Sequence, residues 1–325
     1  MRKYIFISPG SETSRQMLLD VEKYKSEDFQ FIKCAYSFRN KIQKKLFEIY
    51  FKINARISLP FNFIWKSAYS IFQIDFSKEI EYYIILGNGD FNYYRSKELN
   101  KLKEQYNIHY IVYLIDPLSG LMSEFMRKNI FSLKTDCIYT FDYWDAKKMD
   151  AIHTMNLYSK KDIARPDNIY KNSVYFVGTN KKNRVESIHK IWDRFQKAEL
   201  KCKFNIVNVR TKQQTRDGIN YNIRNSYDKV LEELQEYECI LEVLQEGQSG
   251  VTLRYYEAIA YNKKLITNNQ LVRKLPFYHP SYMYVYEKIE DIDLEWIKTD
   301  VNVDYGYNNE FSPINFIQEI KEKVS

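Results

Sequence analysis

The chain lacks most of the short motifs that mark catalytic or metal sites. It has no GxxxxGK[ST] phosphate loop, no GxGxxG, no GxSxG and no HExxH, and its four histidines share no ligand spacing. Its four cysteines form no CxxC pair. These absences narrow the choice of function and leave no metal site indicated.

The sequence also has little that would place it in a membrane or outside the cell. No run approaches about 18 uncharged apolar residues, and the apolar stretch of residues 4–7 is too short for a signal peptide. Three of the cysteines lie in apolar, strand-like segments, where buried free thiols are the usual finding. We therefore expect a cytoplasmic protein, and its 325 residues predict two domains of roughly 150 residues each.

The charge is modest and mixed. A net charge of +7 suits an anionic partner such as a nucleotide sugar, a lipid headgroup or a nucleic acid without choosing among them. A nucleic-acid-binding protein gathers its basic residues on one face, whereas here 42 acidic residues are interspersed with 49 basic ones. The composition therefore disfavours nucleic acid as a partner.

Apolar runs alternate with helical patterns along both halves of the chain. Strands are predicted over residues 3–8, 29–34, 81–86, 109–115, 136–141, 174–179, 203–209, 239–244, 265–267 and 282–286, and helices over about 13–24, 39–57, 184–199, 226–236, 252–261 and 314–324. This alternation predicts an α/β protein with two doubly wound parallel sheets. We expect the linker at Pro166-Asp167-Asn168, which gives domains 1–166 and 167–325, with a final helix free to pack back on the first domain.

The most informative stretch runs from Cys239 to Asn269. It reads as a buried strand, a glycine-bearing loop, a helix ending at Asn262 as a left-handed cap, and a second strand. The free N–H groups at such a helix start attract a phosphate, and hydroxyl, amide and guanidinium groups add donors. The candidate ligands of a diphosphate are Gly247, Gln248, Ser249, Gly250, Thr252 and Arg254.

Glu257 follows in the same helix, and two interpretations remain open. A carboxylate does not favour phosphate, so its partner in a nucleotide site is a pair of hydroxyls such as a ribose diol. Alternatively, Glu257 is a solvated helix residue and the loop is an ordinary strand-to-helix turn.

This segment resembles the donor-site signature of GT-B glycosyltransferases of the bacterial capsule and lipopolysaccharide type. The matching residues are Gly250, Glu257, Ala258, Ala260 and the run 264–267. The family's common form separates two glutamates by seven residues, whereas Glu246 and Glu257 have ten between them, and Asn262 stands where the family usually has glycine. The resemblance covers only this stretch.

The start of the second half resembles the same family in kind. Gly178, Thr179, Lys182 and Arg184 follow a predicted strand, as the glycine and basic residues near the donor phosphates do in these enzymes. The resemblance implies two Rossmann-like domains facing a cleft (the GT-B fold), a nucleoside diphosphate sugar as donor substrate, and neither a metal nor another cofactor. On their own, Lys181, Lys182 and Arg184 are also explained as solvated groups of a surface turn.

The first domain would present the acceptor. Asp90 and Asp116 follow predicted strands at their carboxyl ends, where ligand crevices of α/β sheets lie, so they are the candidate catalytic bases of an inverting enzyme. A retaining enzyme needs no such base, and the sequence does not choose. The one DxD run, Asp291-Ile292-Asp293, precedes a helical segment and is better explained by helix capping than by a metal.

The resemblance implies transfer of a sugar to a glycan acceptor, often lipid-linked, in the synthesis of cell-surface polysaccharide. Two alternatives remain open. One is transfer of a polyol phosphate from a nucleotide-activated donor, which would use the same phosphate cradle. The other is a non-catalytic protein that binds a nucleotide or a nucleic acid.

One helical segment carries a second signal. In the predicted helix 39–57 an apolar stripe, Ile42, Leu46, Ile49, Ile53 and Ile57, shares one face, and Arg39, Lys41, Lys44, Lys45, Lys52 and Arg56 surround it. The stripe either faces the core or rests on the anionic inner surface of the plasma membrane, helped by Phe61, Phe63 and Trp65. The second interpretation makes the protein peripheral to the membrane.

Overall fold

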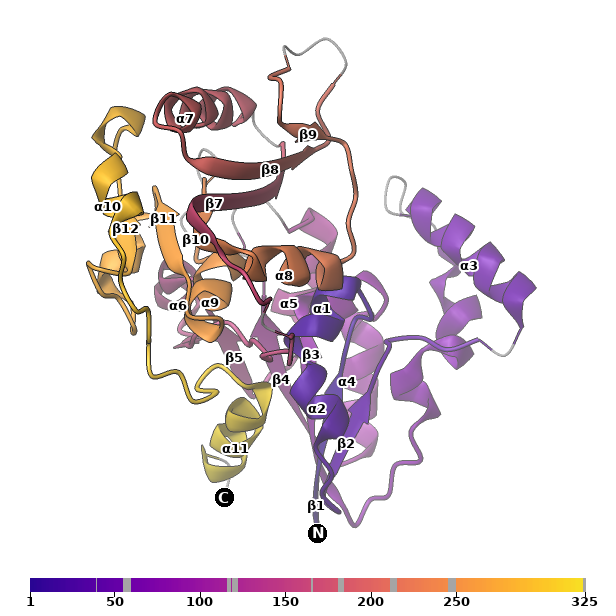
Figure 1. The fold of residues 1–325 in the computed structure, drawn as a ribbon. Helices are drawn as coiled ribbons and strands as arrows, with labels where there is room; N and C mark the ends of the chain where they lie inside the picture. Colours follow the sequence, from indigo (N-terminus) through magenta and orange to yellow (C-terminus); the bar gives the residue numbers. More distant parts are fainter. Residues whose placement is uncertain are drawn as a thin grey trace. The chain divides into compact units, whose positions relative to one another are not determined.

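The protein consists of two compact units. The computed structural model describes residues 1–325 except 39, 55–59, 116–117, 119–121, 165, 181–183, 211–214, 245–249 and 324–325. It also leaves out the side chains of Thr13, Asn54 and residues 60–63. The first unit comprises residues 1–157 and 316–325, and the second comprises residues 158–315. The division therefore comes before the Pro166–Asn168 stretch, and the last segment of the chain belongs to the first unit (Figure 1).

The first unit contains one parallel sheet. Its strands are β1 (Arg2–Ile7), β2 (Phe29–Ile32), β3 (Glu81–Gly87), β4 (Ile108–Leu114), β5 (Cys137–Thr140) and β6 (Ile152–His153). They lie in the order β2-β1-β3-β4-β5-β6, and neighbouring strands pair in parallel. The direction in which the strands are added reverses between β1 and β3, which is the topological switch point of this sheet.

The first unit also contains helices, most of which lie beside this sheet (Figure 1). They are α1 (Glu12–Met17), α2 (Leu19–Lys23), α3 (Lys41–Asn54), α4 (Ser96–Gln105), α5 (Glu124–Ser132), α6 (Tyr143–Met149) and the returning α11 (Pro313–Lys323), with 3-10 helices η1 (Pro60–Ala68), η2 (Ser70–Gln73) and η3 (Asn88–Asn92). Successive residues of a strand point to opposite faces, so Ile84 packs into the core with Ile71 and Leu99, whereas Tyr83 faces the other side. On that other side Phe316 of α11 lies 4.9 Å from the ring of Tyr139.

The second unit has the same layered construction. Its strands are β7 (Tyr170–Thr179), β8 (Lys201–Val207), β9 (Asn220–Tyr221), β10 (Tyr237–Glu242), β11 (Lys264–Thr267) and β12 (Met283–Val285), in the order β12-β11-β10-β7-β8-β9. All of these neighbours pair in parallel. Counted from β7 as the first strand, this is the 3-2-1-4-5-6 order of dinucleotide-binding Rossmann domains, with its switch point between β7 and β10.

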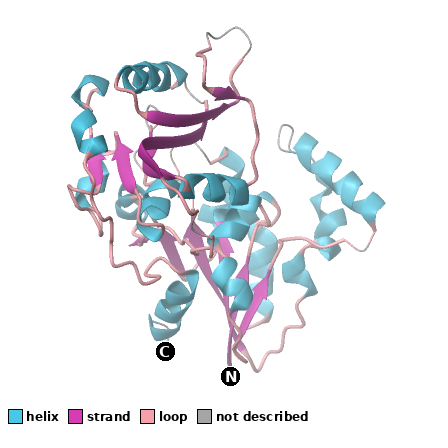
Figure 2. Ribbon diagram, viewed as in Figure 1, coloured by secondary structure: helices cyan, strands magenta, loops and turns pink. Residues whose placement is uncertain are grey.

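The helices of the second unit are α7 (Val185–Lys197), α8 (Tyr227–Gln235), α9 (Leu253–Ala260) and α10 (Leu294–Lys298), with 3-10 helices η4 (Gln270–Lys274) and η5 (Ile289–Asp291). Figure 2 shows helices beside both sheets. In α7 the apolar residues recur at helical spacing, and Ile188, Ile191 and Phe195 are fully buried against the sheet. The predicted α/β class with two Rossmann-like doubly wound domains is confirmed.

Helix α3 packs on the first unit through a face other than its aliphatic stripe. The face that docks on the first unit is aromatic: Phe47 is 1% exposed and its ring lies 4.8 Å from Tyr36 and 5.4 Å from Trp65. The apolar stripe that includes Ile42 and Leu46 is exposed instead, so the prediction that this stripe faces the core is wrong. Trp65 is half-buried beside Phe47, and Ile57 and the side chains of Phe61 and Phe63 lie outside the described residues.

Candidate nucleotide-binding site

The central βαβ unit has the predicted form. Strand β10 pairs in parallel with β11, and α9 connects them, packed on both. Thr252 caps the start of α9 by accepting a hydrogen bond from the Arg254 N–H at 3.2 Å. Asn262 follows the end of α9 with φ of 52°, which confirms it as the left-handed residue, a conformation that asparagine tolerates.

Arg184 lies at the switch point of the second sheet. It is the residue before α7, and its side chain folds back so that Nη1 donates a 2.8 Å hydrogen bond to the Val243 carbonyl just after β10. The guanidinium lies over Gly178 at the end of β7, where a Cβ would stand 2.5 Å from Nη2. Only glycine leaves this space free, so Gly178 allows Arg184 to reach across the carboxyl ends of both strands.

The Arg184 cation is held in an unfavourable environment. Burial, together with the nearby Arg254 cation, lowers the pKa of Arg184 to about 10. Its Nε is buried and has no hydrogen-bond partner among the described residues. A buried donor without a partner is costly, and two cations near each other raise that cost. An anion at this point would relieve both penalties.

Arg254 is held by the buried carboxylate of Glu257. One of its guanidinium nitrogens forms an ion pair with Glu257, and the other carboxylate oxygen of Glu257 accepts a 2.5 Å hydrogen bond from the Tyr227 hydroxyl. Glu257 is fully buried rather than solvated. Burial raises its pKa, and the Arg254 cation and the Tyr227 hydroxyl oppose that rise.

A second buried carboxylate of the site, that of Glu242, was not predicted. Glu242 ends β10, is 2% exposed, and accepts hydrogen bonds from the hydroxyls of Thr252 and Thr267. Burial raises the pKa of Glu242, and the two threonine hydroxyls and the Arg254 cation oppose that rise. Glu242 therefore ties the start of α9 to the end of β11. The only sequence signal was a charged residue inside an otherwise apolar strand.

The remaining predicted ligands fall into two groups. Thr179 is the last residue of β7, and Gly250 is buried, with its carbonyl 3.4 Å from the Asn269 amide nitrogen. Lys182, Gly247, Gln248 and Ser249 lie outside the described residues, as does Asp116 of the first unit. The structure thus brings Gly178, Arg184, Thr252, Arg254 and Glu257 to the carboxyl edge of one sheet.

Asp90 lies near the switch point of the first sheet. It sits in η3 directly after β3, is fully buried, and its Oδ2 accepts a 2.8 Å hydrogen bond from the Gly87 N–H. Its Oδ1 has no partner within the described part of the chain. Burial raises the pKa of Asp90 well above its usual value, and the Gly87 hydrogen bond opposes that rise only in part.

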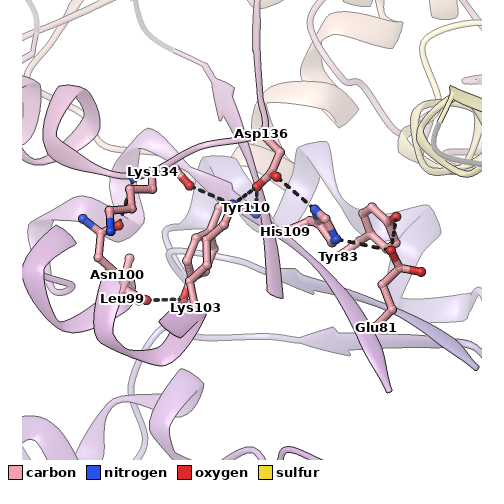
Figure 3. Close-up of polar contacts among 9 residues, drawn as sticks. All are labelled: Glu81, Tyr83, Leu99, Asn100, Lys103, His109, Tyr110, Lys134 and Asp136. Carbon is pink, nitrogen blue, oxygen red and sulfur yellow. Dashed lines mark hydrogen bonds and ion pairs between the residues drawn. The ribbon is translucent and has the colours of Figure 1, made fainter. Parts of the chain in front are cut away.

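A separate polar cluster lies at the opposite, amino edge of the first sheet (Figure 3). The His109 ring is 2.9 Å from Asp136 and 3.2 Å from Glu81, and it stacks on Tyr83 with ring centroids 4.7 Å apart. Asp136 also accepts from the Tyr110 N–H at 2.9 Å and pairs with Lys103. These contacts join β3, β4 and the start of β5, so the cluster has an evident structural role.

The described residues contain neither a metal-ligand cluster nor a membrane-spanning helix. Among the residues that the structure describes, no three His, Cys, Asp or Glu side chains are grouped to hold a metal ion. Asp293 of the DxD run caps α10, accepting from the N–H groups of Glu295 and Trp296, as its position predicts. None of the described helices is long and apolar enough to span a membrane.

Comparisons with solved structures identify the fold. Scans against family models and curated protein sequences give no match. The chain resembles an alpha-glucosyltransferase in complex with UDP and a 13-mer DNA containing a central A:G mismatch, with 12% identity and a TM-score of 0.56 over 100% of both chains. It also resembles an alpha-glucosyltransferase in complex with UDP-glucose and DNA containing an abasic site, with 11% identity and a TM-score of 0.54 over 100% of this chain and 99% of that one.

A third match has a different assigned activity. A protein assigned as a UDP-N-acetylglucosamine 2-epimerase from Listeria monocytogenes aligns with 10% identity and a TM-score of 0.52 over 100% of this chain and 97% of the other. At such low identity these matches define the fold rather than the reaction. The chain is a protein of GT-B fold, built from two Rossmann-like domains.

Proposed function

We propose that the protein transfers a sugar from a nucleoside diphosphate sugar to an acceptor hydroxyl, with the second unit binding the donor. The observation that carries this proposal is Arg184, a buried cation at the switch point of a Rossmann-order sheet, whose Nε lacks a partner among the described residues. Ligands of such sheets bind outside the carboxyl ends of the strands at this point. The site has the charge and the position that a diphosphate requires.

In this proposal the two guanidiniums neutralise the leaving group. As the bond between sugar and phosphate breaks, negative charge accumulates on the diphosphate, and donors already oriented toward it stabilise that charge. Arg184 and Arg254 present planar forks suited to phosphate oxygens. Three further candidates, Thr179, Gly250 and Thr252, lie at the same edge of the sheet. The sequence alone adds the candidate phosphate ligands Lys182, Gly247, Gln248 and Ser249.

Glu257 has two roles in the proposal. Its carboxylate fixes the fork of Arg254, which the ion pair supports. It also stays our candidate ligand for the ribose hydroxyls of the donor. The two roles are separable, because the first predicts a loss of stability on substitution and the second a loss of nucleotide affinity in the folded protein.

The catalytic base is proposed to come from the first unit. Asp90 and Asp116 are the candidates, and an inverting reaction would use one of them to take the acceptor proton. A carboxyl group accepts a proton only when ionised, so the raised pKa of Asp90 makes it a base only toward higher pH. Asp116 lies outside the described residues and remains a candidate base on the sequence alone.

The acceptor we propose is a glycan, lipid-linked at the membrane, in the synthesis of capsule or lipopolysaccharide. The resemblance of residues 239–269 to enzymes of this kind supports it. Two structural neighbours were solved with DNA, so a DNA acceptor is the competing candidate, and the third neighbour makes epimerisation of a nucleotide sugar another. Transfer of a polyol phosphate from an activated nucleotide would use the same cradle.

The donor proposal is tested by thermal unfolding in the presence of nucleotides. We expect UDP or another nucleoside diphosphate at about 100 times its Kd to stabilise the protein by about 2.7 kcal/mol, because it binds only the folded state. The matching nucleoside without phosphates should give a much smaller shift. If no nucleoside diphosphate shifts the transition, the donor site is not where we place it. Product analysis with a bound nucleotide sugar then separates transfer from epimerisation.

A further inference from the structure

Helix α3 has two apolar faces, and only one of them is covered. At about 100° per residue, Phe47 and Phe51 point away from the stripe formed by Ile42, Leu46, Ile49 and Ile53. The aromatic face is occupied, since Phe51 lies 4.8 Å from the ring of Tyr93 and Phe47 lies among Tyr36, Phe38 and Trp65. The helix is therefore already anchored to the first unit without its aliphatic stripe.

The aliphatic stripe faces solvent. Its exposed fractions are 69% for Ile42, 54% for Leu46, 48% for Ile49 and 45% for Ile53. The four residues fall within roughly 60° of one another around the helix axis. No other helix or strand among the described residues carries more than two large apolar side chains this exposed. A contiguous apolar stripe of this kind marks an interaction surface rather than ordinary surface variation.

A row of lysines borders the stripe on one side. Lys41, Lys45 and Lys52 share that flank, and Lys44 lies further round the helix; all four are exposed. The helix carries one acidic residue, Glu48, against these four cations. None of the four lysines forms an ion pair with any residue that the structure describes, so their charge is available to a partner.

We propose that α3 docks the protein on an anionic lipid surface. Aliphatic side chains enter the boundary between headgroups and acyl chains, while neighbouring lysines contact anionic headgroups, which is the chemistry of interfacial amphipathic helices. The aromatic face keeps the helix attached to the first unit at the same time. Figure 1 shows α3 at the periphery of that unit, away from its sheet.

The two halves of the surface together select this occupant. Duplex DNA would use the lysines but gain nothing from four exposed aliphatic side chains, because its outer surface is phosphate. A second copy of the chain would cover the stripe, but it would bring the same lysine row against itself. An anionic membrane matches both the apolar stripe and the charge. The proposal rests on the first unit alone and does not require the donor site to be correct.

The test is co-sedimentation of the full chain with vesicles of phosphatidylcholine alone or mixed with phosphatidylglycerol. We expect binding only to the mixed vesicles. Each lysine near an anionic surface contributes roughly fivefold to partitioning, so changing Lys41, Lys45 and Lys52 to Gln should weaken binding on the order of a hundredfold. The matched control changes Lys190, Lys197 and Lys274 of the second unit to Gln, removes the same charge from exposed positions, and should bind as wild type.

A second variant separates lipid from the other occupants. Changing Ile42, Leu46, Ile49 and Ile53 to Gln should also abolish vesicle binding and leave the helix intact, since Gln is a good helix former and these side chains are exposed. Circular dichroism and the melting temperature check that the fold is kept. Wild-type protein that stays in solution with anionic vesicles overturns the proposal. DNA binding by the wild type that the lysine variant loses and the aliphatic variant keeps also overturns it. So does a wild-type dimer that binds no vesicles and becomes monomeric when Ile42, Leu46, Ile49 and Ile53 are changed to Gln.

Discussion

The two units share a layered parallel sheet but differ in the charge placed at the switch point. In the second unit Arg184 lies across the ends of β7 and β10, beside the cation of Arg254. In the first unit the buried carboxyl of Asp90 lies near the switch point, directly after β3. The sheets also differ in strand order. Similar architecture can therefore prepare one edge for an anion and the other for a proton-bearing group, because the loops decide the chemistry.

The largest expected effect is a loss of stability when the Glu257 carboxylate, which pairs with Arg254, is removed. Glu257→Ala leaves the buried Arg254 cation without its ion pair, and we expect the free energy of unfolding to fall by about 3–5 kcal/mol. Urea unfolding at pH 7 measures this change. The double variant Arg254→Met, Glu257→Leu removes both charges and should recover most of the loss. A Glu257→Ala protein as stable as wild type would mean that the pair is unimportant to the fold.

The next effect is on nucleotide affinity. Arg184→Gln keeps a donor for the Val243 carbonyl but removes the cation, and we expect the affinity for a nucleoside diphosphate to fall by about 10- to 100-fold. The unfolding free energy should change by less than about 1 kcal/mol, because a costly buried charge is also removed. Titration calorimetry measures the affinity, with Lys190→Gln on the exposed face of α7 as control. Equal affinities for wild type and Arg184→Gln would mean that the Arg184 cation does not bind the diphosphate, and that the difference in charge between the two units has no role in nucleotide binding.

Removing the buried charge at the switch point of the first unit should raise the free energy of unfolding instead of lowering it. Because burial raises the pKa of Asp90, its contribution to stability is complete below the unfolded value of about 3.9 and falls as the pH rises above it. Asp90→Asn should therefore be more stable than wild type at pH 7 and equal to it below pH of about 4. Denaturant unfolding across this range tests the expectation. Nucleotide affinity should not change, whereas turnover should be lost if Asp90 is the base.

The smallest effect belongs to the polar cluster at the amino edge of the first sheet. Although burial opposes the charged form, hydrogen bonds from Lys103, His109 and the Tyr110 N–H hold the pKa of Asp136 below its usual value. Its stabilisation is present above pH of about 4 and is lost as the pH falls through the folded pKa. Asp136→Asn should cost about 0.5–1 kcal/mol at neutral pH and little in acid, since the group is partly exposed.

A matched control distinguishes this cluster from ordinary surface pairs. Glu124 and Lys128 form an ion pair on α5 in which both side chains are about three-quarters exposed. Glu124→Gln should change the unfolding free energy far less than Asp136→Asn does, at any pH, because solvent screens this exposed pair. A loss as large as that of Asp136→Asn would mean that the cluster has no special structural role.

Much of the local structure could be predicted from the sequence. The strand, loop, helix and strand of residues 239–269, the left-handed Asn262 and the Asp293 cap all depend on residues close together in the chain, so spacing and residue type were sufficient. The predicted helix over residues 13–24 is divided at Leu18 into α1 and α2. Such boundaries depend on tertiary packing, which spacing does not report.

Helix α3 shows where periodicity stopped being informative. Its aliphatic stripe has the regular helical spacing that predicts burial, yet the side chains that pack are Phe47 and Phe51 on another face. Both faces are apolar in the sequence, and the helix has one place to dock. The choice was made by the aromatic cluster around Tyr36, Trp65 and Tyr93, whose members come from distant segments of the chain.

The sequence alone determined the α/β class, the two-unit size, the βαβ unit and the residue types of the candidate site. Tertiary structure decided the strand orders, the reach of Arg184 to the Val243 carbonyl, and the pairing of Arg254 with Glu257 and Tyr227. The physical reason is distance along the chain. Periodicity reports neighbours within a few turns, whereas residues 184 and 243 meet only because β7 and β10 become adjacent when the sheet forms.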